Sequence, residues 1–403
     1  HHQLARKIAA ETIILLKNQG NLLPLTEAKL DQKESLLVVG ELAQEVRYQG
    51  IGSSQVNPTR LDSHYQALEE KFSEQLKLHY TPGYSSEAET EENENLKEKA
   101  LREAENKDYV IIYAGLPDQV EAEGYDREDM QLPEEQNKLI KELAAVNPNI
   151  IVVLNNGSAV DLCQWVDKVS AVIEAGLPGQ AGALALADII AGEVNPSAKL
   201  TESYPLKLED NPSYLDFPGT KGSVRYGEGI YIGYRYYDKK KKELLFPFGY
   251  GLSYTEFAYR ALEAPDHLEA GEKLKVKVLI ENTGLFKGKE IVQLYIAQKN
   301  PALDRPPKEL KAFGKIELDP GEKEWLELEL DYRDLAYYHP EVGWIVESDQ
   351  FKIMIGASSR DIKFIEEIKV ESRQQLKELT AKTPFEDWLA DPLGKIAVEE
   401  VLS

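Results

Sequence analysis

Residues 121–127, with the sequence EAEGYDR, carry the side chains best suited to acid–base chemistry in this chain. A carboxylic acid that protonates a leaving group near neutral pH needs a raised pKa, which burial or crowding by like charges supplies. Glu123 is a candidate for such an acid because carboxylates crowd its neighbourhood: Asp118, Glu121, Asp126, Glu128 and Asp129. Arg127 is placed to hold Asp126 as an ion pair. The competing interpretation is a solvated acidic loop, since 70 of the 403 residues are Asp or Glu.

A buried strand is expected before this loop and a helix after it. Residues 109–114 form a continuous apolar run bounded by charge on one side and by Gly115 on the other, which is typical of a strand in a parallel sheet covered on both faces. After the loop, Pro133 is a helix start signal, and four apolar residues recur at helical spacing: Leu139, Ile140, Leu143 and Val146. The loop therefore leaves the carboxyl end of a central strand, the edge at which open α/β sheets bind ligands.

The first 210 residues alternate between strands and helices. Apolar runs predict further strands at 36–39, 76–80, 150–154 and 171–174, and helices are expected at 61–72, 87–106 and 181–191. Strands separated by helices require a parallel sheet with helices on both faces. We therefore expect an α/β sandwich with a mostly parallel sheet over residues 1–210. Residues 1–16 have the pattern of an amphipathic helix without a capping residue, so we expect further chain before His1 in the native polypeptide.

The character of the sequence changes after residue 210. Residues 211–252 are rich in Pro, Gly and Tyr, and we interpret them as an ordered linker whose tyrosines pack between two domains rather than stack on sugars. Residues 253–370 alternate apolar and polar positions between turn signals, which predicts an antiparallel, immunoglobulin-like β-sandwich. Residues 371–403 return to a helical, charged pattern and are interpreted as a tail of unknown placement.

Composition argues against several classes of partner. The net charge of −23 disfavours nucleic acid and anionic membrane surfaces, and no apolar run approaches the ~18 residues of a membrane span. A single cysteine, Cys163, fits a reducing compartment, so we expect a cytoplasmic location. We expect no metal site, because the chain has one cysteine and few histidines, and because His1 and His2 are adjacent rather than one helical turn apart. We also expect no cofactor. Residues 50–54, GIGSS, lack the Lys of a phosphate-binding P-loop, which disfavours nucleotide binding.

Several spaced motifs in one order resemble the C-terminal half of glycoside hydrolase family 3 enzymes, and most of all bacterial β-glucosidases. They are residues 9–18 (AAETIILLKN) with 22–25, 47–54 (RYQGIGSS), 123–127 (EGYDR) with Leu132, Pro133 and Gln136, 156–158 (NGS), 178–180, 195–197 with Lys199 and Leu200, and 246–254 (FPFGYGLSY). The resemblance covers residues 1–370, while the tail matches poorly. Ala198 and Thr201 depart from the family, which usually has Gly and Pro there.

The resemblance implies a retaining, exo-acting β-glycosidase whose site lies between two domains. Glu123 would be its general acid/base, and residues 253–370 would be a fibronectin type III-like domain. In the family the nucleophile is an Asp on a (β/α)8 barrel, which is absent from this chain. A retaining mechanism needs two carboxyl groups roughly 5 Å apart, and only the proton shuttle is expected here. The substrate contacts expected from this chain are Arg47, Gln49, Ser53, Ser54 and Tyr125, although a glycine-rich structural turn explains the first four equally well.

The function that we predict from the sequence is therefore the C-terminal portion of a β-glucosidase that hydrolyses terminal non-reducing β-D-glucosyl residues. Its expected partners are a β-glucoside or oligosaccharide, the barrel of the same enzyme, and a second copy in a homodimer. The alternatives are a non-catalytic carbohydrate-binding or dimerisation module and a β-xylosidase of the same family. A hydrolase complete within these residues, with Asp126 as nucleophile, ranks last. The sequence does not choose among glucose, xylose, galactose and arabinose.

Overall fold

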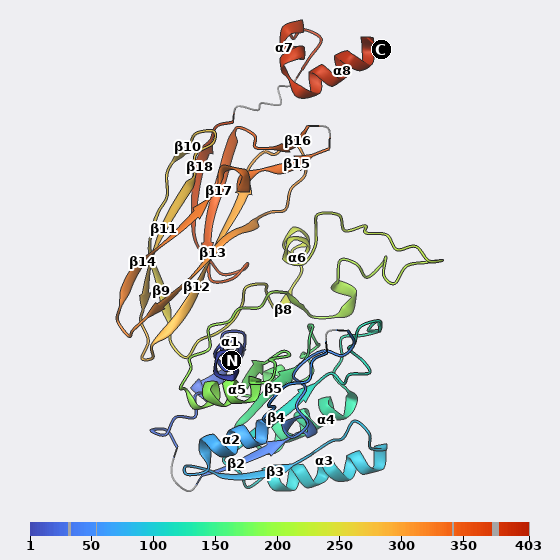
Figure 1. Cartoon of the computed structure of the whole chain (residues 1–403), viewed down its shortest axis with the longest axis vertical. Coiled ribbons are helices and arrows are strands. Elements are labelled where there is room, and N and C mark those ends of the chain that lie inside the picture. The colour runs from blue at the N-terminus through green and yellow to red at the C-terminus, as the bar shows by residue number, and fades with distance from the viewer. Residues whose placement is uncertain (31–33, 54, 341, 373–378, 403) are drawn as a thin grey trace.

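The computed structural model describes residues 1–30, 34–53, 55–340, 342–372 and 379–402 (Figure 1). Ser54, one of the predicted substrate contacts, lies outside the described residues. The chain forms an elongated molecule, with an α/β part at the amino-terminal end and a β-sandwich beyond it (Figure 1). Two short helices, α7 (Phe385–Ala390) and α8 (Pro392–Leu402), lie at the far end.

A six-stranded sheet organises the α/β part. Its strand order is β1 (Ile14–Asn18), β6 (Ala171–Glu174), β5 (Ile150–Asn155), β4 (Tyr109–Gly115), β2 (Ser35–Val39) and β3 (Lys77–Thr81). All neighbouring pairs are parallel except the edge pair β1–β6, which is antiparallel. Every residue of β4 and β5 is buried, as the unbroken apolar runs predicted. The predicted mostly parallel α/β sandwich is confirmed.

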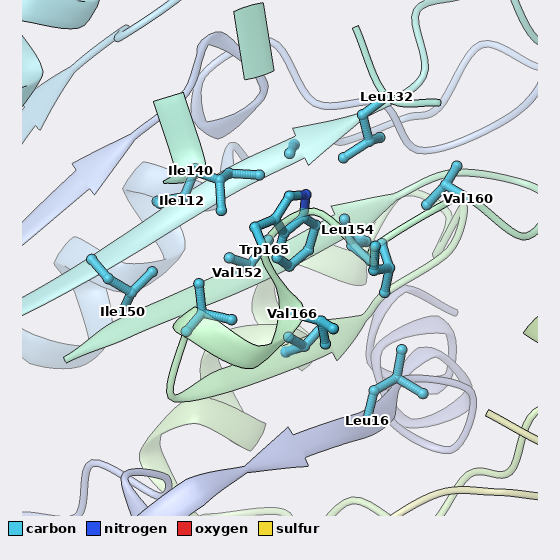
Figure 2. Close-up of a cluster of buried hydrophobic side chains, with 14 of the residues drawn as sticks. Leu16, Ile112, Leu132, Ile140, Ile150, Val152, Leu154, Val160, Trp165 and Val166 are labelled. Carbon is cyan, nitrogen blue, oxygen red and sulfur yellow. The ribbon is translucent and has the colours of Figure 1, made fainter. Parts of the chain in front are cut away.

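Helices cover both faces of this sheet. Helices α1 (His2–Ala10), α2 (His64–Phe72) and α5 (Gly182–Ala191) pack on one face, and α3 (Thr90–Ala104) and α4 (Glu134–Val146) pack on the other. Successive residues of a strand point to opposite faces, so Ile111 and Ile112 of β4 enter different cores. Figure 2 shows the core on the α4 side, where strand side chains surround the buried ring of Trp165.

The helix expected over residues 1–16 is wrong in its second half. Helix α1 ends at Ala10, and the chain then turns into the edge strand β1. The side chains of residues 13–16 are all buried and divide between the two cores, which a helix with one apolar face cannot achieve. Helix α4 matches the prediction better, since Leu139, Ile140 and Leu143 are buried, whereas Val146 at its end is 36% exposed.

The second part of the chain is the predicted β-sandwich, and its strand pairs are antiparallel except for the short parallel pair β10–β18. One sheet has the order β10 (His267–Leu268), β18 (Ile362–Val370), β17 (Asp349–Gly356), β12 (Gly288–Gln298) and β13 (Glu309–Leu318). The other has the order β14 (Lys323–Leu330), β11 (Leu274–Asn282) and β9 (Phe257–Glu263). Their inner faces form one apolar core. A short hairpin of β15 (Tyr337–His339) and β16 (Gly343–Ile345) forms a separate two-stranded sheet.

The segment that joins the two parts is ordered and contacts both. It contains helix α6 (Tyr234–Lys240) and strand β8 (Leu244–Phe246), which pairs with β7 (Tyr204–Pro205). Residues 247–254, here called the strap, follow β8. Leu252 N donates to Leu15 O at 2.8 Å, and Gln293 of the sandwich donates to Gly249 O at 3.0 Å. Tyr254 donates to the carbonyl of Ile189 at 2.9 Å. Tyr254 therefore contacts the α/β part, whereas Tyr214 and Tyr226 of the predicted linker are 43% and 80% exposed and do not follow the expected packing between the two parts.

Single 3-10 turns complete the described elements: Gln19–Asn21, Glu41–Ala43, Val166–Lys168, Leu208–Asp210 and Tyr332–Leu335. Among the helices of the described ranges, none combines the length and apolar character needed to cross a bilayer.

Candidate active site

The first turn of α4 fixes both ends of the loop that follows β4. Gln136 accepts a hydrogen bond from Gly115 N at 2.9 Å, where the strand ends. Asn137 donates to Leu132 O at 2.9 Å, where the loop returns to the helix, and Trp165 donates to Asn137 at 3.0 Å. Gln136 and Asn137 are both buried, so these amides hold the loop rather than face solvent. The loop of residues 116–133 therefore leaves the carboxyl edge of the sheet in a defined path.

Glu121 turns into the protein and clamps this loop to the end of β5. Its carboxylate accepts hydrogen bonds from Gly157 N at 2.7 Å, from Ser158 Oγ at 2.5 Å and from Arg47 Nη1 at 2.8 Å. Burial alone would raise the pKa of Glu121, but the donors Ser158, Gly157 and Arg47 outweigh burial and lower it. Glu121 is therefore an ionised, structural carboxylate at neutral pH.

Arg47 completes the clamp from a third segment. Its side chain is 5% exposed. Besides the carboxylate of Glu121, it donates to Glu121 O at 3.0 Å, to Asp118 Oδ1 at 3.3 Å and to Asn155 O at 3.4 Å. All three guanidinium nitrogens are thus engaged within this chain. Arg47 lines the edge of the site, but its direct contact with substrate stays a prediction.

Glu123 lies only two residues further along and has the opposite environment. Its side chain is exposed, and Oε2 accepts hydrogen bonds from Ser53 N at 3.0 Å and Ser53 Oγ at 2.8 Å. These two donors lower the pKa of Glu123 below its usual value. The raised pKa expected from crowding is therefore not present in this chain. The physical reason is that the neighbouring Glu121 is neutralised by Arg47, while solvent reaches Glu123.

Arg127 also differs from the expectation. In the described part of the chain it makes no ion pair with Asp126, which is exposed. Instead, Arg127 Nη1 donates to Ser158 Oγ at 2.8 Å and to Ala159 O at 3.2 Å. Burial lowers the pKa of Arg127, although Glu121 opposes this shift. Ser158 thus joins Glu121 and Arg127, so the segment after β5 is held by both ends of the EAEGYDR motif.

A buried acid, Glu174, also supports the segment after β5. Glu174, at the end of β6, accepts hydrogen bonds from Tyr204 at 2.7 Å, from Gly176 N at 2.9 Å and from Asn156 at 3.2 Å. Burial raises the pKa of Glu174 to about 8, even though these three donors oppose the shift. Glu174 was not among the site residues predicted from the sequence. The available signal was a carboxylate directly at the end of an apolar strand.

The exposed side of the loop borders a hollow of about 270 Å³. Glu123 and Tyr125 line it together with Arg47, and Tyr125 is 66% exposed. Gln49, another predicted contact, instead closes its own loop by donating to Val56 O at 3.0 Å and accepting from Val56 N at 3.1 Å. The structure thus brings Glu123, Ser53 and Tyr125 to one open face. This arrangement offers one solvent-accessible carboxylate with two fixed donors, which is suited to proton transfer.

One cluster of potential metal ligands occurs among the described residues, and it lies far along the chain from this loop. His267, Glu269 and Glu371 bring one ligand atom each within 4.8 Å of one another. Glu371 also forms an ion pair with Lys369 at 2.9 Å, so the ammonium group of Lys369 already neutralises this carboxylate.

Comparisons with known proteins agree with the geometry. The description "Glycosyl hydrolase family 3 C-terminal domain" matches residues 13–254, and "Fibronectin type III-like domain" matches residues 290–359. The chain is 44% identical over its whole length to "Thermostable beta-glucosidase B" of Acetivibrio thermocellus, of which it covers 53%. It is 37% identical to "Exo-alpha-(1->6)-L-arabinopyranosidase" of Bifidobacterium breve, again covering 53% of that protein.

Solved structures give the same assignment. The GH3 beta-glucosidase of Bifidobacterium adolescentis is 36% identical, with a TM-score of 0.86 over 98% of this chain and 57% of that one. The chain thus spans about half the length of the relatives that it matches. The alignment with the Acetivibrio protein extends through residues 371–403, beyond the expected limit of the resemblance at residue 370, whereas the two family descriptions end at residues 254 and 359. The chain belongs to glycosyl hydrolase family 3, and it carries the C-terminal α/β domain of that family followed by a fibronectin type III-like domain.

Proposed function

We propose that this chain is the C-terminal portion of a retaining exo-β-glycosidase of the β-glucosidase type, with Glu123 as its general acid/base. The supporting observation is the contrast between the two glutamates of the loop. The carboxylate of Glu121 is engaged in the ion pair with Arg47, whereas the carboxylate of Glu123 accepts a hydrogen bond from Ser53 at an open face of the molecule. The substrate would be a terminal, non-reducing β-D-glucosyl residue of an oligosaccharide or glucoside.

In this mechanism, protonated Glu123 donates its proton to the glycosidic oxygen as the leaving group departs. A second carboxylate attacks the anomeric carbon and forms a covalent glycosyl-enzyme. Glu123, now ionised, then takes a proton from the water that hydrolyses this intermediate. The hydrogen bonds from Ser53 stabilise the ionised form that acts in this second step. The clamp keeps the loop in place throughout, since Glu121 holds the end of β5.

The second carboxylate comes from a segment outside these residues in this proposal, namely a (β/α)8 barrel of the same enzyme. A retaining pair requires two carboxyl groups roughly 5–5.5 Å apart. The approach of another carboxylate and the exclusion of water both raise a carboxyl pKa. The lowered pKa of Glu123 in this chain would therefore rise in the complete enzyme, where the acid form is needed for the first step.

Leaving-group dependence tests the role of Glu123. The complete enzyme with Glu123→Gln should lose turnover of substrates with poor leaving groups, such as cellobiose, by a factor of roughly 10²–10⁴. Activated aryl glucosides, whose leaving groups need little protonation, should lose much less in their first step. The comparison is made on kcat/KM, which reports the first step, and equal losses of kcat/KM on both substrate classes would contradict an acid/base role.

The sugar specificity is a separate proposal, because relatives of similar identity are named for different sugars. One is named a beta-glucosidase and another an arabinopyranosidase. We favour glucose, because the more similar of these two relatives is the beta-glucosidase. Relative kcat/KM values for aryl β-glucoside, β-xyloside and α-L-arabinopyranoside measure the preference, and a dominant value for either pentoside would overturn it.

A further inference from the structure

Glu174, at the carboxyl end of β6, is a buried acid that forms no ion pair with any residue that the structure describes. Other buried acids do form ion pairs: Asp188 with Arg6, Asp210 with Lys242, and Glu290 with Lys199. A carboxylate in a protein interior is costly unless a cation compensates its charge, so a buried carboxyl without a cation favours its neutral form. The surroundings of Glu174 therefore suit a protonated acid, in contrast to Glu121, which Arg47 holds as an ion.

The carboxyl group of Glu174 joins three segments of the chain. Its Oε2 accepts hydrogen bonds from Tyr204 Oη of β7 at 2.7 Å and from Asn156 Nδ2, after β5, at 3.2 Å. Its Oε1 accepts from Gly176 N, after β6, at 2.9 Å. A tyrosine hydroxyl both donates and accepts, so the contact with Tyr204 is kept when Glu174 carries the proton. A neutral Glu174 therefore ties the ends of β5 and β6 to β7.

Asn156 begins a short segment, residues 156–158, here called the support segment. Asn156 is 3% exposed, and its Nδ2 donates to Ser158 O at 2.9 Å as well as to Glu174. One side-chain amide thus bridges the carboxyl of Glu174 and the backbone of the support segment. Movement of either group breaks a hydrogen bond at a site where little solvent can replace it.

The support segment in turn holds the loop that carries the proposed acid/base. Gly157 N donates to Glu121 at 2.7 Å, and Ser158 Oγ donates to it at 2.5 Å. Glu121 lies two positions before Glu123, so the placement of Glu123 depends on the conformation of the support segment.

Ionisation would place a charge on Glu174 where the surrounding groups oppose it. Tyr204 is the titratable group in direct contact, and Glu202 lies close enough for its negative charge to repel an ionised Glu174. Arg127 interacts with Glu202, but its Nη1 already donates to Ser158. The strand neighbours of Glu174 are apolar: Ile14 of β1 and Leu154 of β5. An ionised Glu174 would therefore draw in water or turn away, and either movement releases the support segment.

We propose that Glu174 is a positioning residue for the acid/base, and that its proton keeps the support segment in the conformation that receives Glu121. This inference rests on the proposed function, because it takes Glu123 as the acid/base. Burial raises the pKa of Glu174 to about 8. The proton is therefore held below that pH and lost in mildly alkaline solution, where the loop loses its fixed place.

The pH dependence of kcat in the complete enzyme tests this role. With activated aryl glucosides, hydrolysis of the glycosyl-enzyme limits kcat, and equal kcat values for two such leaving groups establish this. That step uses ionised Glu123 as base, so titration of Glu123 alone predicts a plateau in alkali. We expect the kcat of the wild type to fall roughly tenfold from pH 7 to 9 instead, because the protonated fraction of Glu174 falls by that factor around a pKa of about 8.

Two variants and a control identify the group that titrates. Glu174→Gln stays neutral at every pH, so it should retain kcat at pH 7 within roughly threefold and remove the fall toward pH 9. Tyr204→Phe removes a hydrogen bond that favours the ionised carboxylate, so it should move the fall to higher pH, and it tests the proposal even if Glu174→Gln does not fold. Glu105→Gln is the matched control, because Glu105 is exposed at the end of α3, and it should follow the wild-type profile.

Amide hydrogen exchange of residues 116–133 reports on the loop independently of activity. After correction for the intrinsic pH dependence of exchange, we expect exchange in the wild type to rise roughly tenfold from pH 7 to 9. In Glu174→Gln we expect no such rise.

Several results would overturn the proposal. A wild-type kcat that stays level up to pH 9 means that ionisation of Glu174 does not disturb the site, and an equal fall in Glu174→Gln means that another group causes it. A fall in kcat without faster exchange of the loop means that Glu174 does not act through the loop. If exchange follows the prediction while Glu123→Ala keeps full hydrolytic activity, the proposed function fails and the positioning of the loop by Glu174 stands.

Discussion

Replacing Glu121 and Glu123 separately by Ala should separate stability from catalysis within one loop. The two residues are the same amino acid two positions apart, but Glu121 is held by three donors and Glu123 is exposed. We expect Glu121→Ala to destabilise the α/β domain strongly. We expect Glu123→Ala to leave its thermal stability unchanged and to abolish efficient hydrolysis by the complete enzyme.

The loss of stability caused by Glu121→Ala follows from the contacts that Arg47 keeps in the variant. Arg47 stays 5% exposed and keeps a single carboxylate contact, to Asp118 at 3.3 Å. Removing one partner of a buried ion pair costs about 3–5 kcal/mol, and the remaining Asp118 contact places the cost near the lower end, about 3 kcal/mol. For a domain of this size each kcal/mol lowers the unfolding midpoint by about 2–4 °C. The midpoint should therefore fall by about 6–12 °C.

Thermal melting of both variants over a range of pH measures this effect. Because the folded-state pKa of Glu121 is lowered, its stabilisation is present above the unfolded pKa of about 4.3 and is lost as pH falls through the folded pKa. The difference between Glu121→Ala and the wild type should thus be constant from pH 6 to 8 and shrink in acid. Equal midpoints for Glu121→Ala and Glu123→Ala at pH 7 would show that the clamp does not hold the loop.

Two further predictions concern residues around this loop. Glu174→Gln should remove a pH dependence of stability, because the folded pKa of about 8 lies above the unfolded value of about 4.3. Wild-type stability should therefore fall as pH rises from about 4.3 to 8, by up to about 1.4 kcal/mol per pH unit, and equal pH profiles of wild type and variant would contradict this. Gly52→Ala should lower kcat of the complete enzyme, because the backbone at Gly52 has φ +100° and an added Cβ would lie 2.6 Å from Glu123 Oε2, which would displace Glu123 from Ser53. An unchanged kcat would mean that Glu123 does not need its contact with Ser53.

The strands around the site could be predicted from sequence because their signal is local. The apolar runs that became β4 and β5 are fully buried, and only a strand covered on both faces accommodates them. The run at residues 13–16 is equally apolar but was assigned to a helix. It becomes β1 because it pairs with β6, more than 150 residues away along the chain, and such a long-range contact leaves no local pattern.

The different roles of Glu121 and Glu123 could not be predicted either, because they also depend on long-range contacts. Sequence reasoning selected Glu123 through the family resemblance but gave Glu121 only the role of a crowding charge. The partner that turns Glu121 inward, Arg47, is 74 residues away, and the partner of Glu123, Ser53, is 70 residues away. Neither neighbourhood exists until the sheet brings the ends of its strands together.

Azide rescue of the Glu123→Ala variant of the complete enzyme is the decisive measurement for the acid/base role. An aryl glucoside with a good leaving group forms the glycosyl-enzyme without an acid, but water then attacks slowly because no base activates it. Azide is a nucleophile that needs no base, and the removed side chain leaves space for it. We predict that added azide accelerates turnover and that the product is the β-glucosyl azide, with configuration retained. Unchanged turnover with no glycosyl azide, or an α-glucosyl azide, would show that Glu123 is not the acid/base, and the α product would assign it as the nucleophile instead.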